Sequence, residues 1–339
     1  MKMAICLIIG AVLLTMAHPA ASQEETAPII SLMIDVDVPT SPTRDDARIA
    51  ELDLQDIYTE IKTRGGTGTI FLTQDVTSSR IRLLLAQYTF LSNFEFAISG
   101  QHSNDQLSGM NLSAQEDLIE TSIAFAEAAR VCGLTSVEVL GFMPPGFDQN
   151  EDTYKAIDDL GIQYDAGFQA GLVSAPGHED DVWPYQVEGY NFYAVPISTV
   201  EVAGELVPLY DCAMNESGVS SSEWQDILVA KLDETAAKGE PMVVLLSTSI
   251  SATDDYLEAL MGFLDYALSK DAIFVNARDL VTIRTTGSLP LPQGGIWECP
   301  TCGQDEVMNI TITREIPETP SSDNESEMNE EIEQEEAVA

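Results

Sequence analysis

The stretch of residues 29–37, which reads IISLMIDVD, decides the fold. It is an almost uninterrupted apolar run that stops at Asp35 and Asp37. Such runs are typical of strands buried on both faces, as in parallel sheets covered by helices. Polar side chains that directly follow a parallel strand lie at its carboxyl end, where α/β barrels build their sites. The stretch therefore predicts a buried first strand with two acids at a candidate site.

Outward from this strand, short apolar runs alternate with helical patterns. Apolar runs predict further strands at residues 69–72, 94–98, 137–142, 162–164, 192–195, 206–210, 242–246 and 273–275. Helical spacing predicts helices around residues 49–61, 81–88, 113–129, 154–160, 224–237, 256–268 and 278–280. The first helix carries an apolar stripe through Ile49, Leu52, Ile57 and Ile61, and a capping box from Ser113 to Glu116 opens the third. This alternation indicates parallel βα units, closed as a barrel or laid out as an open sheet.

The charge of the chain limits its partners. The 339 residues include 56 acidic and 15 basic side chains, for a formal net charge of −41. A surface of this kind repels phosphate backbones and other anionic polymers, so the sequence predicts no nucleic-acid partner. It favours a neutral or cationic ligand. Solubility at high salt is the simpler interpretation of the charge, and we prefer it to any specific role.

The two ends of the chain differ from its middle. Lys2 followed by the apolar run 4–17 predicts a signal peptide over residues 1–22, and hence a secreted or cell-surface protein; an uncleaved anchor is the alternative. No later stretch is long and apolar enough to span a membrane. Residues 287–314 form a Pro/Gly-rich linker and a CxxC segment, and we expect residues 315–339 to be a disordered acidic tail.

Four cysteines remain after the predicted signal: Cys132, Cys212, Cys299 and Cys302. Export permits disulfides, although the CxxC formed by Cys299 and Cys302 also resembles half of a zinc knuckle. A second CxxC is absent, so we favour a disulfide, and the sequence leaves its pairing open.

Four further motifs follow the first strand in order. They are HSNDQ at residues 102–106, FMPPG at 142–146, DDVW at 180–183 and VVLLS at 243–247. Together with the two acids, they resemble the polysaccharide deacetylase (NodB-homology) family, also called carbohydrate esterase family 4, over residues 27–286. The resemblance implies a deformed (β/α) barrel and a divalent metal, zinc or similar. It also implies hydrolysis of the C–N bond of N-acetyl groups on carbohydrates, with a neutral or N-acetylated glycan as partner.

The resemblance assigns roles to the acids and to the HSNDQ loop. Asp35 corresponds to the general base, Asp37 to a metal ligand and His102 to the first of two histidine ligands. Gln106 stands where the second histidine belongs, and an amide oxygen is a poorer zinc donor than imidazole. Asp105 is a substitute ligand on this interpretation. The alternative for His102 is a hydrogen bond within a polar loop.

Two further catalytic positions are changed. Met143 stands where the family has the arginine that holds the base ionised, and Ser247 where it has the histidine that protonates the departing amine. Loss of a positioned general acid costs on the order of a hundredfold to ten-thousandfold in rate. His178, the other histidine after the predicted signal, is either a replacement acid or an exposed loop residue. Trp183 either stacks on a sugar or packs against the fold.

Three functions are compatible with these residues. The first is an active metal-dependent deacetylase that relies on Asp35, Asp37 and His102. The second is a non-catalytic descendant that binds a glycan in the old groove, for which we expect weak or absent metal binding. The third is an envelope interaction protein that works through its acidic surface and tail. Because three catalytic positions are changed, we rank the second slightly above the first.

Overall fold

The computed structural model describes residues 27–39, 42–76, 94–127, 130–131, 135–136 and 138–289. The predicted signal peptide, the helix expected at 81–88, the CxxC segment and the acidic tail lie outside these residues, as do Cys132, Cys299 and Cys302. Within the described part of the chain, Cys212 is a free thiol. No helix in this part is both long and apolar enough to cross a membrane.

The elements follow one another in a largely alternating order. The strands are β1 (Ile29–Asp35), β2 (Thr69–Leu72), β3 (Glu95–Ile98), β4 (Arg130–Val131), β5 (Thr135–Ser136), β6 (Gly141–Phe142), β7 (Tyr164–Asp165), β8 (Tyr185–Gln186), β9 (Tyr193–Ala194), β10 (Thr199–Val202), β11 (Glu205–Pro208), β12 (Pro241–Ser247) and β13 (Ile273–Val275). The α-helices are α1 (Arg44–Thr63), α3 (Leu112–Glu127), α4 (Glu151–Asp159), α5 (Asp211–Glu216), α6 (Ser221–Lys238), α7 (Thr248–Ser251), α8 (Asp254–Ser269) and α9 (Ala277–Thr286). Short 3-10 turns cover Gln74–Val76, Leu107–Gly109 and Pro145–Phe147.

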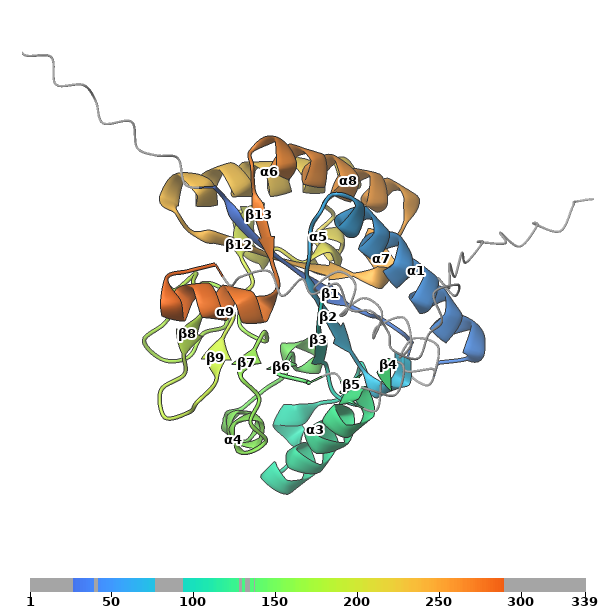
Figure 1. The fold of residues 1–339 in the computed structure, drawn as a ribbon, viewed down its shortest axis with the longest axis vertical. Coiled ribbons are helices and arrows are strands. Elements are labelled where there is room, and N and C mark those ends of the chain that lie inside the picture. Colours follow the sequence, from blue (N-terminus) through green and yellow to red (C-terminus); the bar gives the residue numbers. More distant parts are fainter. Residues whose placement is uncertain are drawn as a thin grey trace, which may run out of the picture.

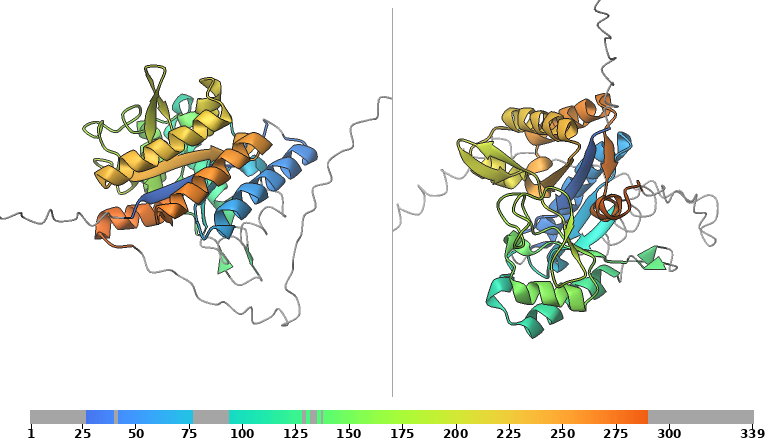
Figure 2. Two further views of the ribbon diagram at one scale, coloured as in Figure 1. Left: turned by 90° about the horizontal axis from the view of Figure 1, so that it is seen from above. Right: turned by 90° about the vertical axis from the view of Figure 1, so that its left-hand side faces the viewer.

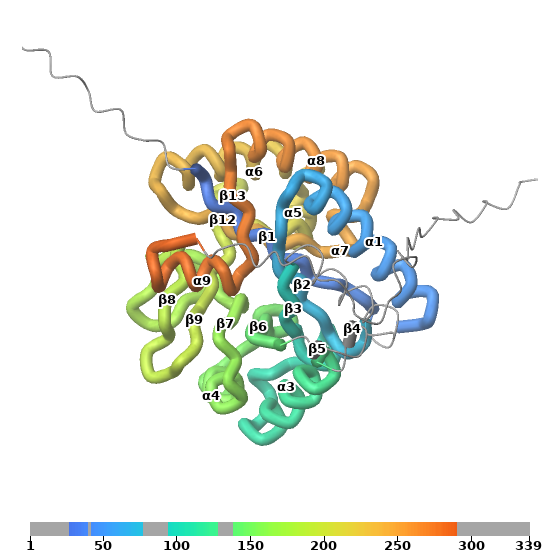
Figure 3. The backbone as a smooth tube through the Cα atoms, in the orientation of Figure 1, coloured from blue at the N-terminus to red at the C-terminus, as the bar shows by residue number. Residues whose placement is uncertain are grey.

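The main sheet is a curled, mostly parallel sheet in the order β12-β1-β2-β3-β6-β7-β9-β8 (Figure 1). Only β8 runs antiparallel to its neighbour, and β13 adds to β1 beside β2. The tube in Figure 3 follows the chain from β1 in blue to α9 in orange. Beyond β9, the backbone N–H of Ser198 donates to the carbonyl of Val243, and the carbonyl of Leu209 accepts from the N–H of Leu245, which connects this segment to β12. The predicted α/β class and deformed (β/α) barrel are confirmed.

Side-chain parity separates the interior of the barrel from its outer face. Met33, Phe71, Val243 and Leu245 share one buried cluster inside the barrel. The alternate residues of β1 and β12 face outward, because successive side chains of a strand point to opposite faces. Outside, α1, α6 and α8 cover the β1–β12 side, while α3 and α4 cover the opposite side (Figure 2). The core therefore has an inner and an outer layer around one sheet.

Helix α9 lies against the end of the barrel where the strands begin. The backbone N–H of Ala277 donates to Thr69 Oγ1 at 2.8 Å, and that of Arg278 donates to Glu95 Oε2 at 3.0 Å. Thr69 and Glu95 are the first residues of β2 and β3. Leu280 of α9 joins the interior cluster. This end is therefore filled, which leaves the carboxyl ends of the strands as the open end.

Two local predictions about helices were wrong. Helix α3 starts at Leu112, and its cap is Asn111, whose Oδ1 accepts from the N–H of Ala114 at 3.1 Å. Ser113 therefore lies inside the helix. In α1 the predicted apolar stripe is buried at Ile57 and Ile61, whereas Ile49 is 55% exposed and Leu54, outside that stripe, is buried.

Candidate functional site

Strand register brings the two acids and the serine of the VVLLS motif together. In the parallel pairing of β1 with β12, Asp35 lies opposite Ser247. Asp35 lies two residues after the inward-facing Met33, and Ser247 lies two residues after the inward-facing Leu245. Both side chains therefore point to the interior of the barrel. Both residues end their strands, so they lie at the open end of the barrel. The register therefore sets Asp35 beside Ser247 at this end of the barrel.

Asp37 is held by the turn that follows β12. Its Oδ2 accepts hydrogen bonds from Ser247 Oγ at 2.5 Å and Ser249 Oγ at 3.1 Å. Its backbone N–H donates to Thr248 Oγ1 at 3.0 Å. The hydroxyls of Ser247 and Ser249 thus hold the carboxylate of Asp37, and the hydroxyl of Thr248 holds its backbone. Ser247 meets Asp37 at the position where the family resemblance implies a proton-donating histidine.

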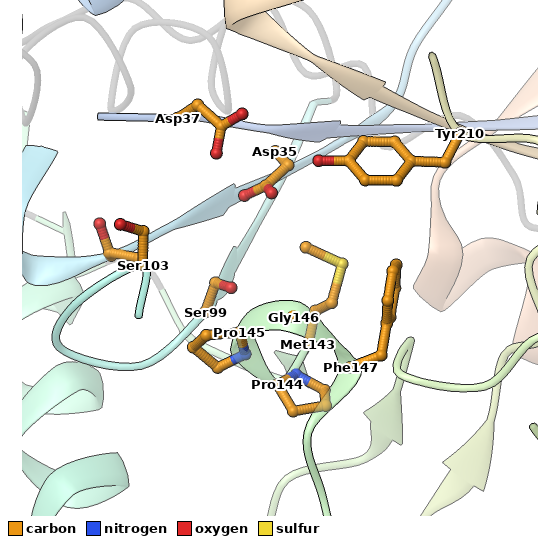
Figure 4. A pocket seen from close by; sticks show the side chains of 11 residues that line it. Asp35, Asp37, Ser99, Ser103, Met143, Pro144, Pro145, Gly146, Phe147 and Tyr210 are labelled. Atoms are coloured by element: carbon orange, nitrogen blue, oxygen red, sulfur yellow. The ribbon is translucent and has the colours of Figure 1, made fainter. Parts of the chain in front are cut away.

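The two acids open into a pocket of about 200 Å³, which we call the site pocket (Figure 4). It is lined by Asp35, Asp37, Thr73, Ser99, Ser103, Met143, Pro144, Pro145, Gly146, Phe147 and Tyr210. The rings of Phe147 and Tyr210 meet edge to face with centroids 6.0 Å apart. Thr73 is 3% exposed, and its Oγ1 is buried with no hydrogen-bond partner among the described residues. The pocket therefore combines carboxylates and hydroxyls with an apolar wall.

Asp35 has an unusual environment for a general base. Burial raises the pKa of its carboxyl well above the usual range, and the nearby charges of Asp37 and Asp211 raise it further. The hydroxyl of Tyr210 points toward Asp35 in Figure 4, and its hydrogen bond lowers that pKa in part. Met143, which is 3% exposed, approaches from the opposite wall. Its thioether cannot supply the positive charge of an arginine, so the rise in pKa is not offset there.

Asp211 lies fully buried behind the pocket. Its carboxylate accepts from the backbone N–H of Ser247 at 2.9 and 3.0 Å and from Ser251 Oγ at 2.5 Å. Burial raises the pKa of Asp211 to about 7, against the opposing effect of these hydrogen bonds. Asp211 thus anchors the end of β12 from the side opposite Asp37.

The HSNDQ loop places its serine, rather than its histidine, at the site pocket. Ser103 lines the pocket and donates to the backbone carbonyl of Val38 at 3.1 Å. The His102 ring, 50% exposed, contacts Asp75 Oδ2 through Nδ1 at 2.8 Å. Asp105 Oδ2 accepts the backbone N–H groups of Gln101 and His102, both at 2.9 Å. Asp105 therefore shapes the loop, and His102 takes part in a polar pair beside the pocket.

The predicted metal ligands do not fit an assembled divalent site in this arrangement. Among the described residues, no three His, Cys, Asp or Glu side chains are grouped so that they could hold a metal ion. Asp37 Oδ2 accepts two hydroxyls, Asp105 Oδ2 accepts two amides, and Gln106 is exposed at the start of a 3-10 turn. The ligand roles of Asp37, His102, Asp105 and Gln106 stay predictions, and we derive no catalytic step through a metal.

His178 and Trp183 do not line the site pocket. The His178 ring stacks on Tyr185 with centroids 4.0 Å apart, and its Nδ1 contacts Asp181 Oδ2 at 2.6 Å. Trp183 packs against the interior cluster, with the Arg284 guanidinium of α9 5.9 Å from its ring. For Trp183, the structure therefore favours the packing alternative over sugar stacking.

Sequence reasoning missed Thr73, Phe147, Tyr210 and Asp211. A signal for three of them was present, because Thr73 and Asp211 directly follow predicted strands, and Tyr210 is the last residue of the strand predicted at 206–210. The same rule that selected Asp35 would have selected them. Phe147 gave no such signal, since its place in the pocket depends on the Pro145–Phe147 turn.

Comparison with solved structures identifies the fold class of this chain. The fold is that of the polysaccharide deacetylases of the NodB or carbohydrate esterase family 4 type, as the order of the motifs predicted. No protein-family model and no curated protein matches the sequence. The likeness therefore rests on solved structures.

Three solved structures illustrate this likeness. A protein from Mycobacterium smegmatis described as a polysaccharide deacetylase is 16% identical, with a TM-score of 0.59 over 82% of this chain and 98% of that one. The Puue allantoinase is 14% identical, with a TM-score of 0.60 over 78% and 92%. A probable polysaccharide deacetylase from Pseudomonas aeruginosa PAO1 is 12% identical, with a TM-score of 0.59 over 78% and 93%. At these identities the likeness extends to the fold alone.

Proposed function

We propose that this chain is an exported polysaccharide-deacetylase-like protein that binds a residue of a non-anionic glycan in the site pocket. Hydrolysis of N-acetyl C–N bonds, the activity of the implied ancestor, is strongly reduced or lost. Export follows from the predicted signal peptide and brings the pocket to extracellular or surface glycans.

The observation that carries this proposal is the hydrogen bond from Ser247 to Asp37. A hydroxyl is a weak acid at neutral pH, so Ser247 cannot replace a histidine that protonates the leaving amine. The same bond occupies an oxygen of the residue that the resemblance assigns to the metal. Met143 in the wall beside Asp35 supports the same conclusion, because no arginine counters the raised pKa of that base.

A retained hydrolase activity is the second candidate, and one observation favours it. His102 contacts Asp75 through Nδ1, which leaves Nε2 available as a ligand. Metal-binding histidines usually donate their second ring N–H to a carboxylate in this way. The pair formed by His102 and Asp75 is therefore compatible with a metal role that requires the loop to move toward Asp37.

Elemental analysis, calorimetry and acetate release test the two candidates on the same full-length preparation. The probe is a β-1,4-linked oligomer of N-acetylglucosamine, with binding followed by calorimetry and acetate measured after long incubation with added zinc. We expect glycan binding with no acetate release above the rate without protein. Stoichiometric metal together with acetate release, both lost in His102→Ala and kept in the distant control Glu201→Gln, would establish the second candidate instead.

A further inference from the structure

The site pocket offers hydrogen-bond acceptors with no positive side chain to balance them. Asp37 presents a carboxylate, Asp35 adds a buried carboxyl group, and Ser99 and Ser103 add hydroxyl groups. Among the described residues that line the pocket there is no Lys, Arg or His. The chain as a whole carries a net charge of −41, so its field also attracts cations. An arrangement of this kind calls for a positively charged group from outside the protein.

The buried hydroxyl of Thr73 is a second, independent indication that the pocket binds a ligand. Thr73 is the first residue after β2, lies in the pocket lining, and has only 3% of its surface exposed. Its Oγ1 is buried and has no hydrogen-bond partner within the described chain. A buried hydroxyl without a partner is unfavourable, and a polar group of a ligand in the pocket relieves that cost.

The opposite wall suits the carbon skeleton that carries such a group. Phe147 and Tyr210 present aromatic rings, and Met143 with Pro144 adds apolar surface. Aromatic faces attract ammonium groups and also pack against apolar faces of ligands. The pocket of about 200 Å³ is smaller than the roughly 300–1,000 Å³ of pockets for drug-sized ligands, so it accepts one small ring.

We propose that the site pocket binds a primary ammonium group carried by a sugar residue, that is, an amino sugar whose nitrogen is unacetylated. The ammonium donates to Asp37, Asp35 and Thr73, while the sugar ring lies against Phe147 and Tyr210. This assignment rests on the proposed function, which supplies the glycan, and it narrows the glycan to a cationic one.

The hydrogen-bonding groups and charge of the pocket favour an ammonium over an acetamide group and over a divalent metal ion. An acetamide nitrogen has one N–H and no charge, so an N-acetylated residue leaves the carboxylates without a counter-charge. A divalent metal requires several anionic or imidazole ligands in fixed geometry, and no such group of three occurs in the described chain. An ammonium has three donors on a rotatable head and needs only acceptors within hydrogen-bond reach.

The test uses three matched tetrasaccharides and the full-length protein. They are β-1,4-linked glucosamine, β-1,4-linked N-acetylglucosamine and β-1,4-linked glucose, which differ only in the group on C2 of each sugar: an ammonium, an acetamide or a hydroxyl. Binding is measured by calorimetry near neutral pH in low salt and in 0.5 M NaCl. We expect the glucosamine oligomer to bind tenfold to a hundredfold more tightly than the other two, on the order that a charge-assisted hydrogen bond provides. Ethanolamine, a primary amine without a sugar ring, is expected to compete weakly.

Variants distinguish the pocket from the general negative field. Asp37→Asn and Thr73→Val are expected to weaken glucosamine binding by about tenfold or more and by a few fold, respectively. The control Glu201→Gln removes one charge from the hairpin of β10 and β11 and is expected to change nothing. Thermal melting of each variant confirms that it is folded.

The outcomes separate this proposal from the proposed function. A preference for glucosamine that survives in Asp37→Asn and Thr73→Val, or vanishes in 0.5 M NaCl, overturns the pocket assignment. Equal or tighter binding of the N-acetylated oligomer also overturns it, but leaves the proposed function standing. Ethanolamine binding as tightly as the glucosamine oligomer contradicts the role of the sugar ring. Failure of all three oligosaccharides to bind contradicts both proposals.

Discussion

At the scale of single residues, the hydrogen bond between Ser247 and Asp37 makes a measurable contribution to stability. Ser247 is fully buried, and its Oγ lies 2.5 Å from Asp37 Oδ2. We predict that Ser247→Ala lowers the free energy of unfolding by about 1–3 kcal/mol, the range for a hydrogen bond to a charged partner. Ser249→Ala is the matched control, since its bond to Asp37 is longer and exposed, and we expect a smaller loss. Urea denaturation at pH 7 measures both, and equal losses would contradict the assignment.

The part of the site built from strand ends could be predicted from the sequence. Asp35, Asp37 and Ser247 were found because strand periodicity fixes which face a side chain takes and where the strand stops. The orientations of His102, Asp105 and Gln106 could not be predicted, because a loop has no such period. There, the direction of each side chain depends on bonds such as those of Asp105 to the backbone of Gln101 and His102.

At the scale of elements, the start of α3 tests how well a cap can be identified. Asn111 Oδ1 accepts from the N–H of Ala114, whereas Ser113 lies within the first turn. We predict that Asn111→Ala destabilises the protein by about 1 kcal/mol, the usual cost of losing such a cap. Ser113→Ala should be close to neutral or slightly stabilising, because alanine is the better helix former. Thermal melts of the two variants decide between the caps, and the reverse ranking would restore the Ser113 capping box.

The elements themselves were easier to predict than their limits. The strands Thr69–Leu72 and Ile273–Val275 were predicted to the residue, because each short apolar run stops at a polar residue, Thr73 or Asn276. The strand expected at 137–142 is reduced to Gly141–Phe142. Leu140 also accepts the backbone N–H groups of Gln163 and Tyr164, so bonding to the next strand extends beyond β6, and the apolar pattern does not reveal where regular pairing stops.

At the scale of the whole molecule, buried acids make stability depend on pH. Burial raises the pKa of Glu95, at the closed end of the barrel, and of Asp165 to about 7 in each case. The folded state then holds these protons more tightly than the unfolded chain does. The resulting stabilisation is complete below the unfolded pKa values near 4 and is lost as the pH rises through about 7.

We therefore predict that the free energy of unfolding falls between about pH 4.5 and pH 7.5, by roughly 3 kcal/mol for each of the two groups at most. Glu95→Gln and Asp165→Asn should each flatten this dependence, since the amides do not titrate. Urea denaturation at several pH values measures the slope. Asp46→Asn is the control, because its side chain is exposed and its pKa is lowered rather than raised. A slope unchanged in both buried variants would refute the prediction.

The fold class was predictable at this scale, whereas the closure of the barrel was not. Alternating strand and helix patterns indicated parallel βα units, but left a barrel and an open sheet as alternatives. Closure depends on Ser198 and Leu209, which bond to β12 from an irregular segment. Ser198 also accepts the Val243 N–H through its Oγ at 2.9 Å, and Leu209 acts through its backbone carbonyl, so neither contact follows from a periodic pattern.

The pairing of β1 has a consequence for how the protein is made. The first strand of the domain is flanked by β12 and β13, which are separated from it by more than two hundred residues of chain. During synthesis, this apolar strand therefore lacks its β12 neighbour until nearly all of the domain has been translated. Contacts so distant along the chain slow folding and prolong the exposure of an aggregation-prone edge. Folding of this barrel thus has to follow completion of the chain, and a nascent fragment ending before β12 requires protection from aggregation.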